Sequence, residues 1–207
     1  MAQPNGSSDR AKYAACMEEI KKRTRVVDAF LNRSCSALYL KTTVESIYLQ
    51  FRKILELIAM ASLSASPEYM ARYDRFRRHY NGKRILRDLE KVNPDFYPQP
   101  TRQVVDPDTG KVVEVVDVES GFLTKDDYVE LYDICGDLLH AENPYDEGQR
   151  DMESRLEDVP EWRNRIVTLL NHHQVQLADS GKQIWVLMHA KSDGRVHVFD
   201  FEEVGPA

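Results

Sequence analysis

A histidine at the end of a predicted helix is the residue best suited to chemistry in this sequence. The pattern over residues 124–140 predicts a helix that ends before Asn143-Pro144, because proline disfavours helical backbone in the residue that precedes it. On this helix His140 shares a polar face with Asp133 and Asp137. A histidine can transfer protons near neutral pH, and a neighbouring carboxylate can orient its ring. We therefore interpret His140, Asp137 and Asp133 as a candidate catalytic group for proton transfer.

Gly136 lies on the same face, one turn before His140. Because glycine has no side chain, it leaves a gap in which another part of the chain could come close. An exposed histidine at a helix end, without any catalytic role, fits the same pattern. The sequence leaves both interpretations open.

A second group of residues is suited to binding phosphate. Pro67 is predicted to open a helix on which Arg72, Arg75 and His79 share one face, with Arg78 beside them. Arginine holds phosphate through a planar fork of N–H donors. The alternative is that His79 is only a favourable cation in the last turn of the helix. We expect Arg72, Arg75, Arg78 and His79 to be the phosphate-binding or RNA-binding residues.

Charge is divided unevenly between the two halves of the chain. The 207 residues carry a net charge of −6, but residues 1–92 carry +8 and residues 93–207 carry −14. This asymmetry indicates a basic face for a polyanion or two halves that attract each other. Solvated helix faces of opposite sign would also produce it. A basic turn over residues 21–25 is expected to be solvated surface of this kind.

The sequence disfavours several classes of protein. Three cysteines without a C-x-x-C pair argue against a disulfide framework and a cysteine zinc site, and indicate a reducing, cytoplasmic setting. Residues 1–8 lack the apolar core of a secretory signal and are expected to be disordered. The apolar run over residues 54–63 is too short to cross a membrane. Phosphate-binding glycine loops, nucleophile elbows and H-E-x-x-H motifs do not occur, and we expect neither a metal nor a cofactor.

The remaining histidines have structural interpretations. His173 falls on the apolar side of a helix predicted from Pro160 to about residue 177, so we expect a hydrogen-bonded core residue. His172 beside it would need outside ligands to bind a metal. His189 and His197 fall on opposite faces of a predicted hairpin, which disfavours a zinc site. The acidic segment 146–159 is expected to be a loop with a helical turn.

The elements that must position these residues are mostly helical. The helix that begins with the capping-box sequence at Thr42 has the broadest apolar face and should be the central core helix, with Arg52 and Glu56 paired at i and i+4. The predicted fold is mainly α, a helical bundle of five to six helices with two β-hairpin embellishments, in a single domain over residues 9–207. The helices are expected to begin near residues 9, 42, 67, 85, 124 and 160, and the hairpins to cover about 102–116 and 184–201.

Two of these helices resemble the HEPN superfamily (higher eukaryotes and prokaryotes nucleotide-binding). The run Tyr48-Leu49-Gln50-Phe51-Arg52-Lys53-Ile54-Leu55-Glu56-Leu57-Ile58 is similar to the HEPN core helix, and residues 135–144 are similar to a HEPN helix that ends in His followed by Asn-Pro. The resemblance covers about residues 10–175. It implies an α-helical bundle, usually a homodimer with a site across the two-fold axis. Many members are metal-independent ribonucleases of toxin–antitoxin and phage-defence systems.

The sequence departs from the HEPN pattern at the catalytic motif. Active members carry an arginine, four to six residues and then the histidine. The histidine exchanges a proton with the ribose 2′-hydroxyl or the leaving oxygen, and the arginine holds the phosphate. Before His140 the corresponding positions are Cys135, Ile134 and Asp133, and an aspartate there would repel a phosphate. Two other pairs fit this spacing, Arg72 with His79 and Arg165 with His172, each with six residues between them.

Two functions are compatible with these observations. The first is a HEPN-like protein that binds RNA or a partner protein in a prokaryotic defence or toxin–antitoxin setting, with metal-independent endoribonuclease chemistry at His140. The second is a catalytically inactive HEPN-like dimerisation and binding scaffold. The expected partners are a second copy of the chain, RNA or a nucleotide, and a cognate antitoxin or defence-complex protein, with no membrane. His140 can take part in catalysis only if the fold brings an arginine to it.

Overall fold

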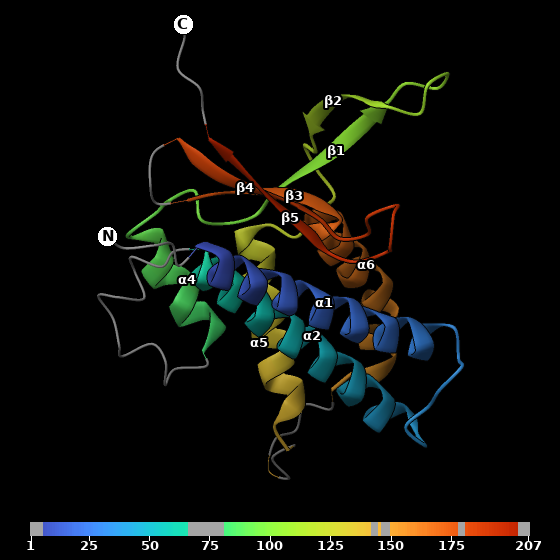
Figure 1. Ribbon diagram of the computed structural model, residues 1–207. Coiled ribbons are helices and arrows are strands. Elements are labelled where there is room, and N and C mark those ends of the chain that lie inside the picture. Colours follow the sequence, from blue (N-terminus) through green and yellow to red (C-terminus); the bar gives the residue numbers. More distant parts are fainter. Residues whose placement is uncertain (1–5, 66–80, 142–144, 146–149, 178–180, 203–207) are drawn as a thin grey trace, which may run out of the picture.

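The computed structural model describes residues 6–65, 81–141, 145, 150–177 and 181–202. These residues form a layer of helices and a five-stranded antiparallel sheet that lies across one side of it (Figure 1). Helices α1 and α2 run antiparallel beside each other, and the β1–β2 hairpin projects beyond the helices (Figure 1). The elements are α1 (Gly6–Leu31), α2 (Leu40–Ser64), α4 (Gly82–Glu90), β1 (Gln99–Val105), β2 (Val112–Asp117), α5 (Lys125–Leu139), α6 (Met152–Leu170), β3 (His172–Gln176), β4 (Lys182–Leu187) and β5 (His197–Glu202).

Helix α2 is the central core helix, as the sequence predicts. It contacts α1, α4, α5 and α6. Arg52 and Glu56 form the predicted pair, with 3.1 Å between Nε and Oε1. Each fully buried large aliphatic or aromatic side chain contributes about 1.5–3 kcal/mol, so this one helix supplies much of the core. Its buried apolar side chains, three and four residues apart, include Val44, Ile47, Tyr48, Phe51, Ile54, Leu55 and Ile58.

The connection between α1 and α2 differs from the prediction at both ends. α1 begins at Gly6, inside the segment expected to be disordered, and ends at Leu31. Leu38, in the connection after α1, is 96% exposed and has a φ of 73°. α2 begins at Leu40 and lacks the predicted capping box. Instead, the Thr42 hydroxyl donates to the carbonyl oxygen of Ala37 and ties the connection to the first turn of α2.

The sheet corrects the predicted fold class. The structure is a mixed α/β fold rather than a mainly α bundle with two separate hairpins, because all five strands form one sheet in the order β2-β1-β3-β4-β5. β3 joins the two predicted hairpins: it pairs with β1 at Gln99 and Pro100 and with β4 along its whole length. Val175, Ile184 and Val186 belong to the same buried core as the helices, so the sheet is a structural layer and not an embellishment.

The boundaries of α6 and β3 also differ from the prediction. α6 begins at Met152, inside the expected loop, and the Asp151 carboxylate caps it by accepting from the backbone N–H of Ser154 at 3.0 Å. Pro160, predicted as its first residue, lies within the helix. α6 ends at Leu170, and the chain enters β3 at His172 instead of continuing as a helix to residue 177.

The helices around the candidate site agree better with the sequence. α4 begins at Gly82, close to the start predicted near residue 85, and Asn81 caps it by accepting from the backbone N–H of Arg84 at 3.1 Å. Thr124 caps α5 as predicted, and α5 ends at Leu139 with His140 as its C-cap. The helix predicted from Pro67 lies outside the described residues. Within the described part of the chain, none of the helices has both the length and the apolar character needed to cross a membrane.

Candidate active site

Helix α5 presents His140 at an exposed end because its opposite side is fixed in the core. The Thr124 hydroxyl accepts from the backbone N–H of Asp127 at 3.1 Å, and the Asp127 carboxylate accepts from the backbone N–H of Thr124 at 3.0 Å. Tyr128, Leu131, Tyr132, Cys135 and Leu138 are buried, and α5 packs against α2. The α5 polar face therefore points away from the core. We define this face as Asp133, Gly136, Asp137 and His140.

His140 leaves the helix with extended backbone and an exposed side chain. Its carbonyl oxygen accepts a hydrogen bond of 2.8 Å from Nη1 of Arg150. The carbonyl end of a helix carries a partial negative charge, which a guanidinium group stabilises. Arg150, from the segment before α6, thus brings a positive charge to the residue that carries the candidate imidazole.

The structure keeps the two predicted aspartates on the α5 polar face but does not join them to the imidazole. Asp133 accepts from Nζ of Lys83 at 2.6 and 2.8 Å, which neutralises its charge. Asp137 is exposed and borders a hollow of about 580 Å³ between α5 and the start of α6, together with Arg150. Among the described contacts, neither carboxylate is hydrogen-bonded to the His140 ring.

Arg52 of α2 occupies the gap at Gly136. A Cβ atom at Gly136 would lie 3.8 Å from Nη1 of Arg52. The guanidinium donates to the Tyr132 hydroxyl at 2.6 Å, to the Tyr132 carbonyl oxygen at 3.2 Å and to Glu56 at 3.1 Å. Three of its five N–H donors are engaged in this way. The arginine one turn before His140 therefore comes from a different helix.

The surroundings hold Arg52 rigidly. The Tyr132 hydroxyl, which accepts from Arg52, also accepts from the backbone N–H of Gly82 at 3.0 Å. The neighbouring Tyr128 is buried and donates to the carbonyl oxygen of Leu55 at 2.8 Å, and burial raises its pKa well above the usual value. Tyr128 therefore keeps its proton at physiological pH, and both tyrosines serve as hydrogen-bonding scaffold around Arg52.

Cys135 lies on the buried side of α5 and is not a candidate nucleophile. Burial raises the pKa of its thiol to about 12, although the Arg52 charge acts in the opposite direction. A thiol must lose its proton to attack a substrate. Cys135 is therefore a core residue at neutral pH.

The remaining residues that the sequence predicts for a site fall into two groups. Arg72, Arg75, Arg78 and His79 lie outside the described residues. Arg165 and His172, which the sequence pairs by spacing, have separate roles. Arg165 binds Asp127 at 2.8 Å and Glu161 at 2.7 Å, whereas His172 is buried in β3 with Nδ1 2.5 Å from the Thr101 hydroxyl.

The described part of the chain contains no cluster of metal ligands. No group of three or more His, Cys, Asp or Glu side chains is arranged there to hold a metal ion. His173, the one candidate on an apolar face, is fully buried and hydrogen-bonded to Tyr13 at 2.7 Å. It is the core residue that the sequence predicts.

Neither Arg52 nor Arg150 is among the site residues that the sequence predicts. The contact of Arg52 could have been predicted, because the sequence has an arginine on the core helix and a glycine on the polar face of α5 that leaves room for it. The contact of Arg150 could not, since nothing in the sequence relates this arginine to the carbonyl oxygen of His140. Both arginines reach α5 through tertiary contacts.

Comparison with known proteins gives no match to a protein-family model, to a curated protein or to a solved structure. A functional proposal for this chain therefore depends on the chemistry and placement of its own residues.

Proposed function

We propose that the protein binds RNA at the end of α5 and that His140 is the acid–base residue of a metal-independent endoribonuclease. The observation that carries the proposal is the presence of two arginines at the helix of His140. Arg52 lies beside Gly136, and Arg150 binds the His140 carbonyl oxygen. The HEPN-like motif requires an arginine near the histidine, and here both come from outside α5.

The chemistry follows from these residue types. The neutral imidazole takes the proton of a ribose 2′-hydroxyl, and the 2′-oxygen attacks the adjacent phosphorus. The bond from phosphorus to the 5′-oxygen breaks, and the imidazolium returns the proton to that oxygen. The products are a 2′,3′-cyclic phosphate and a 5′-hydroxyl group. An arginine stabilises the charge that develops on the phosphoryl oxygens.

The test is cleavage of an end-labelled single-stranded RNA in EDTA. We expect His140→Ala to lower the cleavage rate by about 100-fold or more, and Arg150→Ala to lower it as well. His197→Ala is the matched control, because it removes a partly exposed histidine on β5 whose ring is hydrogen-bonded to Asp193, away from α5. If the wild type and His140→Ala leave the RNA equally intact, the catalytic proposal is wrong.

A non-catalytic binding scaffold is the second candidate. Asp133 and Asp137 place two carboxylates on the α5 polar face, and three N–H donors of Arg52 already serve the scaffold. Both features favour a protein partner over a phosphate. That partner would be a second copy of the chain, an antitoxin or a defence-complex protein. RNA affinity that falls steeply with salt, without cleavage, would favour an RNA-binding scaffold, and an absence of RNA binding would favour the protein partner.

The proposal includes a cytoplasmic location. Cys16, Cys35 and Cys135 are all free thiols in the structure, and free cysteines suit a reducing compartment. Localisation of a tagged protein tests this part separately.

A further inference from the structure

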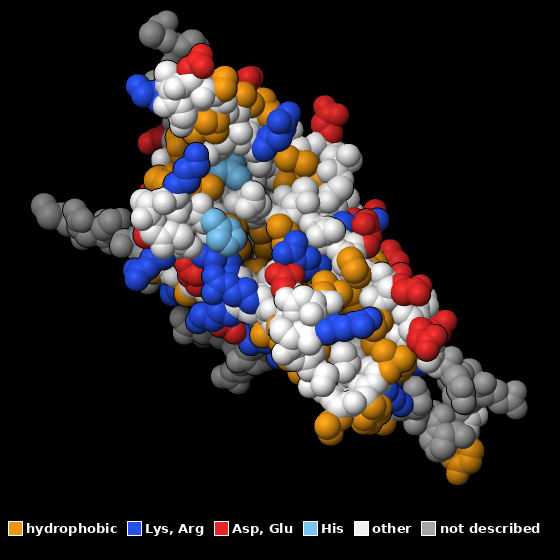
Figure 2. Space-filling view, turned by 90° about the vertical axis from the view of Figure 1, so that its right-hand side faces the viewer, with side chains coloured by type: hydrophobic (Ala, Val, Ile, Leu, Met, Phe, Trp, Pro, Cys, Tyr) orange, Lys and Arg blue, Asp and Glu red, His pale blue; other side chains and the backbone are white. Residues whose placement is uncertain are grey.

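A cavity of about 230 Å³ opens between α1, α6 and the connection that follows β4. We call it the cationic cavity. It lies on the side of the molecule shown in Figure 2, where Lys and Arg side chains gather beside histidine side chains. One wall is apolar and buried, with Ile20, Ile166 and Leu170 in it. The polar residues that line the cavity and matter here are Lys21, Arg25, Asp28, Arg163, Asn171 and His189.

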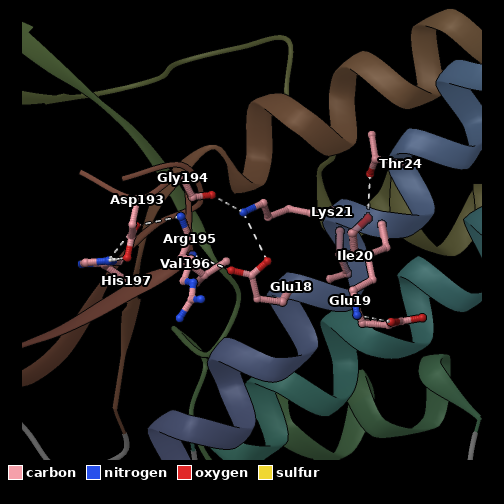
Figure 3. A network of polar contacts seen from close by, with 11 residues as sticks. Glu18, Glu19, Ile20, Lys21, Thr24, Asp193, Gly194, Arg195, Val196 and His197 are labelled. Atoms are coloured by element: carbon pink, nitrogen blue, oxygen red, sulfur yellow. Dashed lines mark hydrogen bonds and ion pairs between the residues drawn. The ribbon is translucent and has the colours of Figure 1, made fainter. Parts of the chain in front are cut away.

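A polar network fixes the rim of the cavity (Figure 3). Lys21 is 7% exposed and donates to the carbonyl oxygen of Gly194 at 2.7 Å, and its ammonium lies 3.2 Å from the Glu18 carboxylate. The same carboxylate accepts from the backbone N–H of Val196 at 2.7 Å. These contacts hold the β4–β5 connection against α1. Among the described residues Lys21 has only these two partners, which leaves one of its three N–H donors for a ligand.

The cavity carries more positive than negative charge. The Asp28 carboxylate is fully engaged by Arg163, with N–O distances of 2.8 and 3.1 Å. Glu18 serves Lys21 and lies outside the lining. Arg25 is exposed, and it has no hydrogen bond or ion pair among the described residues. The cavity therefore has one uncompensated guanidinium next to an imidazole, that of His189.

The electrostatics of His189 agree with this surplus. Partial burial lowers the pKa of its imidazole, the charges of Lys21 and Arg25 lower it further, and Glu18 acts in the opposite direction. The cavity thus disfavours one more positive charge. An anion between these groups would reverse that preference.

We propose that the cationic cavity binds a phosphomonoester, carried by a free mononucleotide or by the end of an RNA strand. A phosphomonoester brings a charge of about −1.5 to −2 and three strong acceptor oxygens. Three groups can donate hydrogen bonds here: the guanidinium of Arg25, the remaining N–H of Lys21 and the ring of His189. They match the three oxygens of a phosphomonoester better than the two oxygens of a carboxylate. The apolar wall suits the sugar or base attached to the phosphate.

Two features limit the size and strength of this site. The cavity is smaller than the roughly 300–1,000 Å³ typical of sites for drug-sized ligands, so it takes a small ligand or one end of a larger one. The carbonyl end of α6 also faces it and disfavours an anion. One of these carbonyl oxygens, that of Asn171, already accepts a hydrogen bond of 3.0 Å from the backbone N–H of Met188, which reduces this effect.

The test is calorimetric titration of the full chain with adenosine 5′-monophosphate. We expect saturable binding of this nucleotide and none of adenosine. Arg25→Gln should weaken binding by about tenfold or more, as expected when a charge-assisted hydrogen bond is lost. Lys22→Gln is the matched control, because Lys22 lies on the same helix with its side chain 71% exposed and paired with Glu19. Arg25 has no hydrogen bond or ion pair with any residue that the structure describes, so its replacement should leave the fold intact.

The source of the phosphate is settled by competition. If a short RNA with a 5′-phosphate displaces the nucleotide and the same RNA with a 5′-hydroxyl does not, the cavity binds RNA ends. If neither RNA displaces the nucleotide, the cavity binds free nucleotides.

Three results would each overturn the proposal: no saturable binding at millimolar nucleotide, equal binding of adenosine, or equal nucleotide affinities of Arg25→Gln and Lys22→Gln. His140→Ala protein should bind the nucleotide as the wild type does, which separates this site from the α5 site.

Discussion

The hydroxyl group of Tyr13 lies 2.7 Å from Nε2 of His173, and both side chains are buried. Nδ1 of His173 lies 2.8 Å from the carbonyl oxygen of Leu170. A carbonyl only accepts hydrogen bonds, so Nδ1 carries the proton and Nε2 accepts from Tyr13. Tyr13 belongs to α1 and His173 to β3. This hydrogen bond therefore links the helical layer to the sheet.

Tyr13→Phe tests how much this link stabilises the fold. The substitution leaves a buried acceptor on His173 without a partner, which costs about 1–3 kcal/mol of unfolding free energy. Urea denaturation at pH 7 measures it. Tyr48→Phe is the control, because the Tyr48 hydroxyl donates at 2.9 Å to the carbonyl oxygen of Arg155, a residue that is only partly buried. A loss no larger for Tyr13→Phe than for Tyr48→Phe would contradict the role given to the link.

His173 also predicts a pH dependence of stability. Burial lowers the pKa of its imidazole from 6.5 to about 4, although the Leu170 carbonyl opposes the shift. The unfolded chain therefore binds more protons between these values, and stability falls as pH decreases from about 6.5 to 4. The full effect is about 3 kcal/mol. Unfolding free energies of the wild type and His173→Gln, compared at pH 7.5 and 4.5, should show a weaker dependence in the variant. Parallel pH dependences would refute this origin.

The sequence predicts those parts of the fold that depend on local pattern. The apolar spacing of α2, the Thr124 cap of α5 and the end of α5 at His140 all follow from residues within one helix. For the same reason the sequence places Asp133, Asp137 and His140 on the polar side of this helix, and all three side chains are exposed in the structure. None of these features requires knowledge of another element.

The features missing from the prediction depend on contacts distant in sequence. β3 was predicted as helix because Leu169, Leu170 and His173 have helical spacing, and only pairing with β1 and β4 makes residues 172–176 a strand. Its pairing with β1 joins residues more than 70 positions apart, which no short window contains. Arg52 reaches Gly136 through the packing of α2 on α5. The sequence therefore does not predict the fold class or the arginines of the site, because both depend on contacts between residues that are distant in sequence.

Gly82→Ala tests the packing that holds Arg52. A Cβ atom at Gly82 would lie 2.3 Å from the Tyr128 hydroxyl and 3.1 Å from the Tyr132 ring. Overpacking of this kind costs about 1–3 kcal/mol, and we expect a lower midpoint of thermal unfolding. Tyr128→Phe removes the closest atom, so the double variant should lose less stability than the sum of the single variants. Strict additivity would mean that the hydroxyl is not the obstacle.

Phosphate binding in the cationic cavity should be coupled to protonation of His189. In the empty cavity, burial, Lys21 and Arg25 lower the pKa of the imidazole, against the opposing charge of Glu18. A bound phosphate adds negative charge beside the ring and raises that pKa, so binding takes up protons and affinity increases as pH falls towards 6. Calorimetric titrations with adenosine 5′-monophosphate, in buffers of different ionisation enthalpy, measure the protons taken up. The phosphate of the nucleotide titrates near pH 6 itself, so the decisive quantity is the difference between the wild type and His189→Gln. If the variant takes up as many protons as the wild type, His189 does not face the bound phosphate.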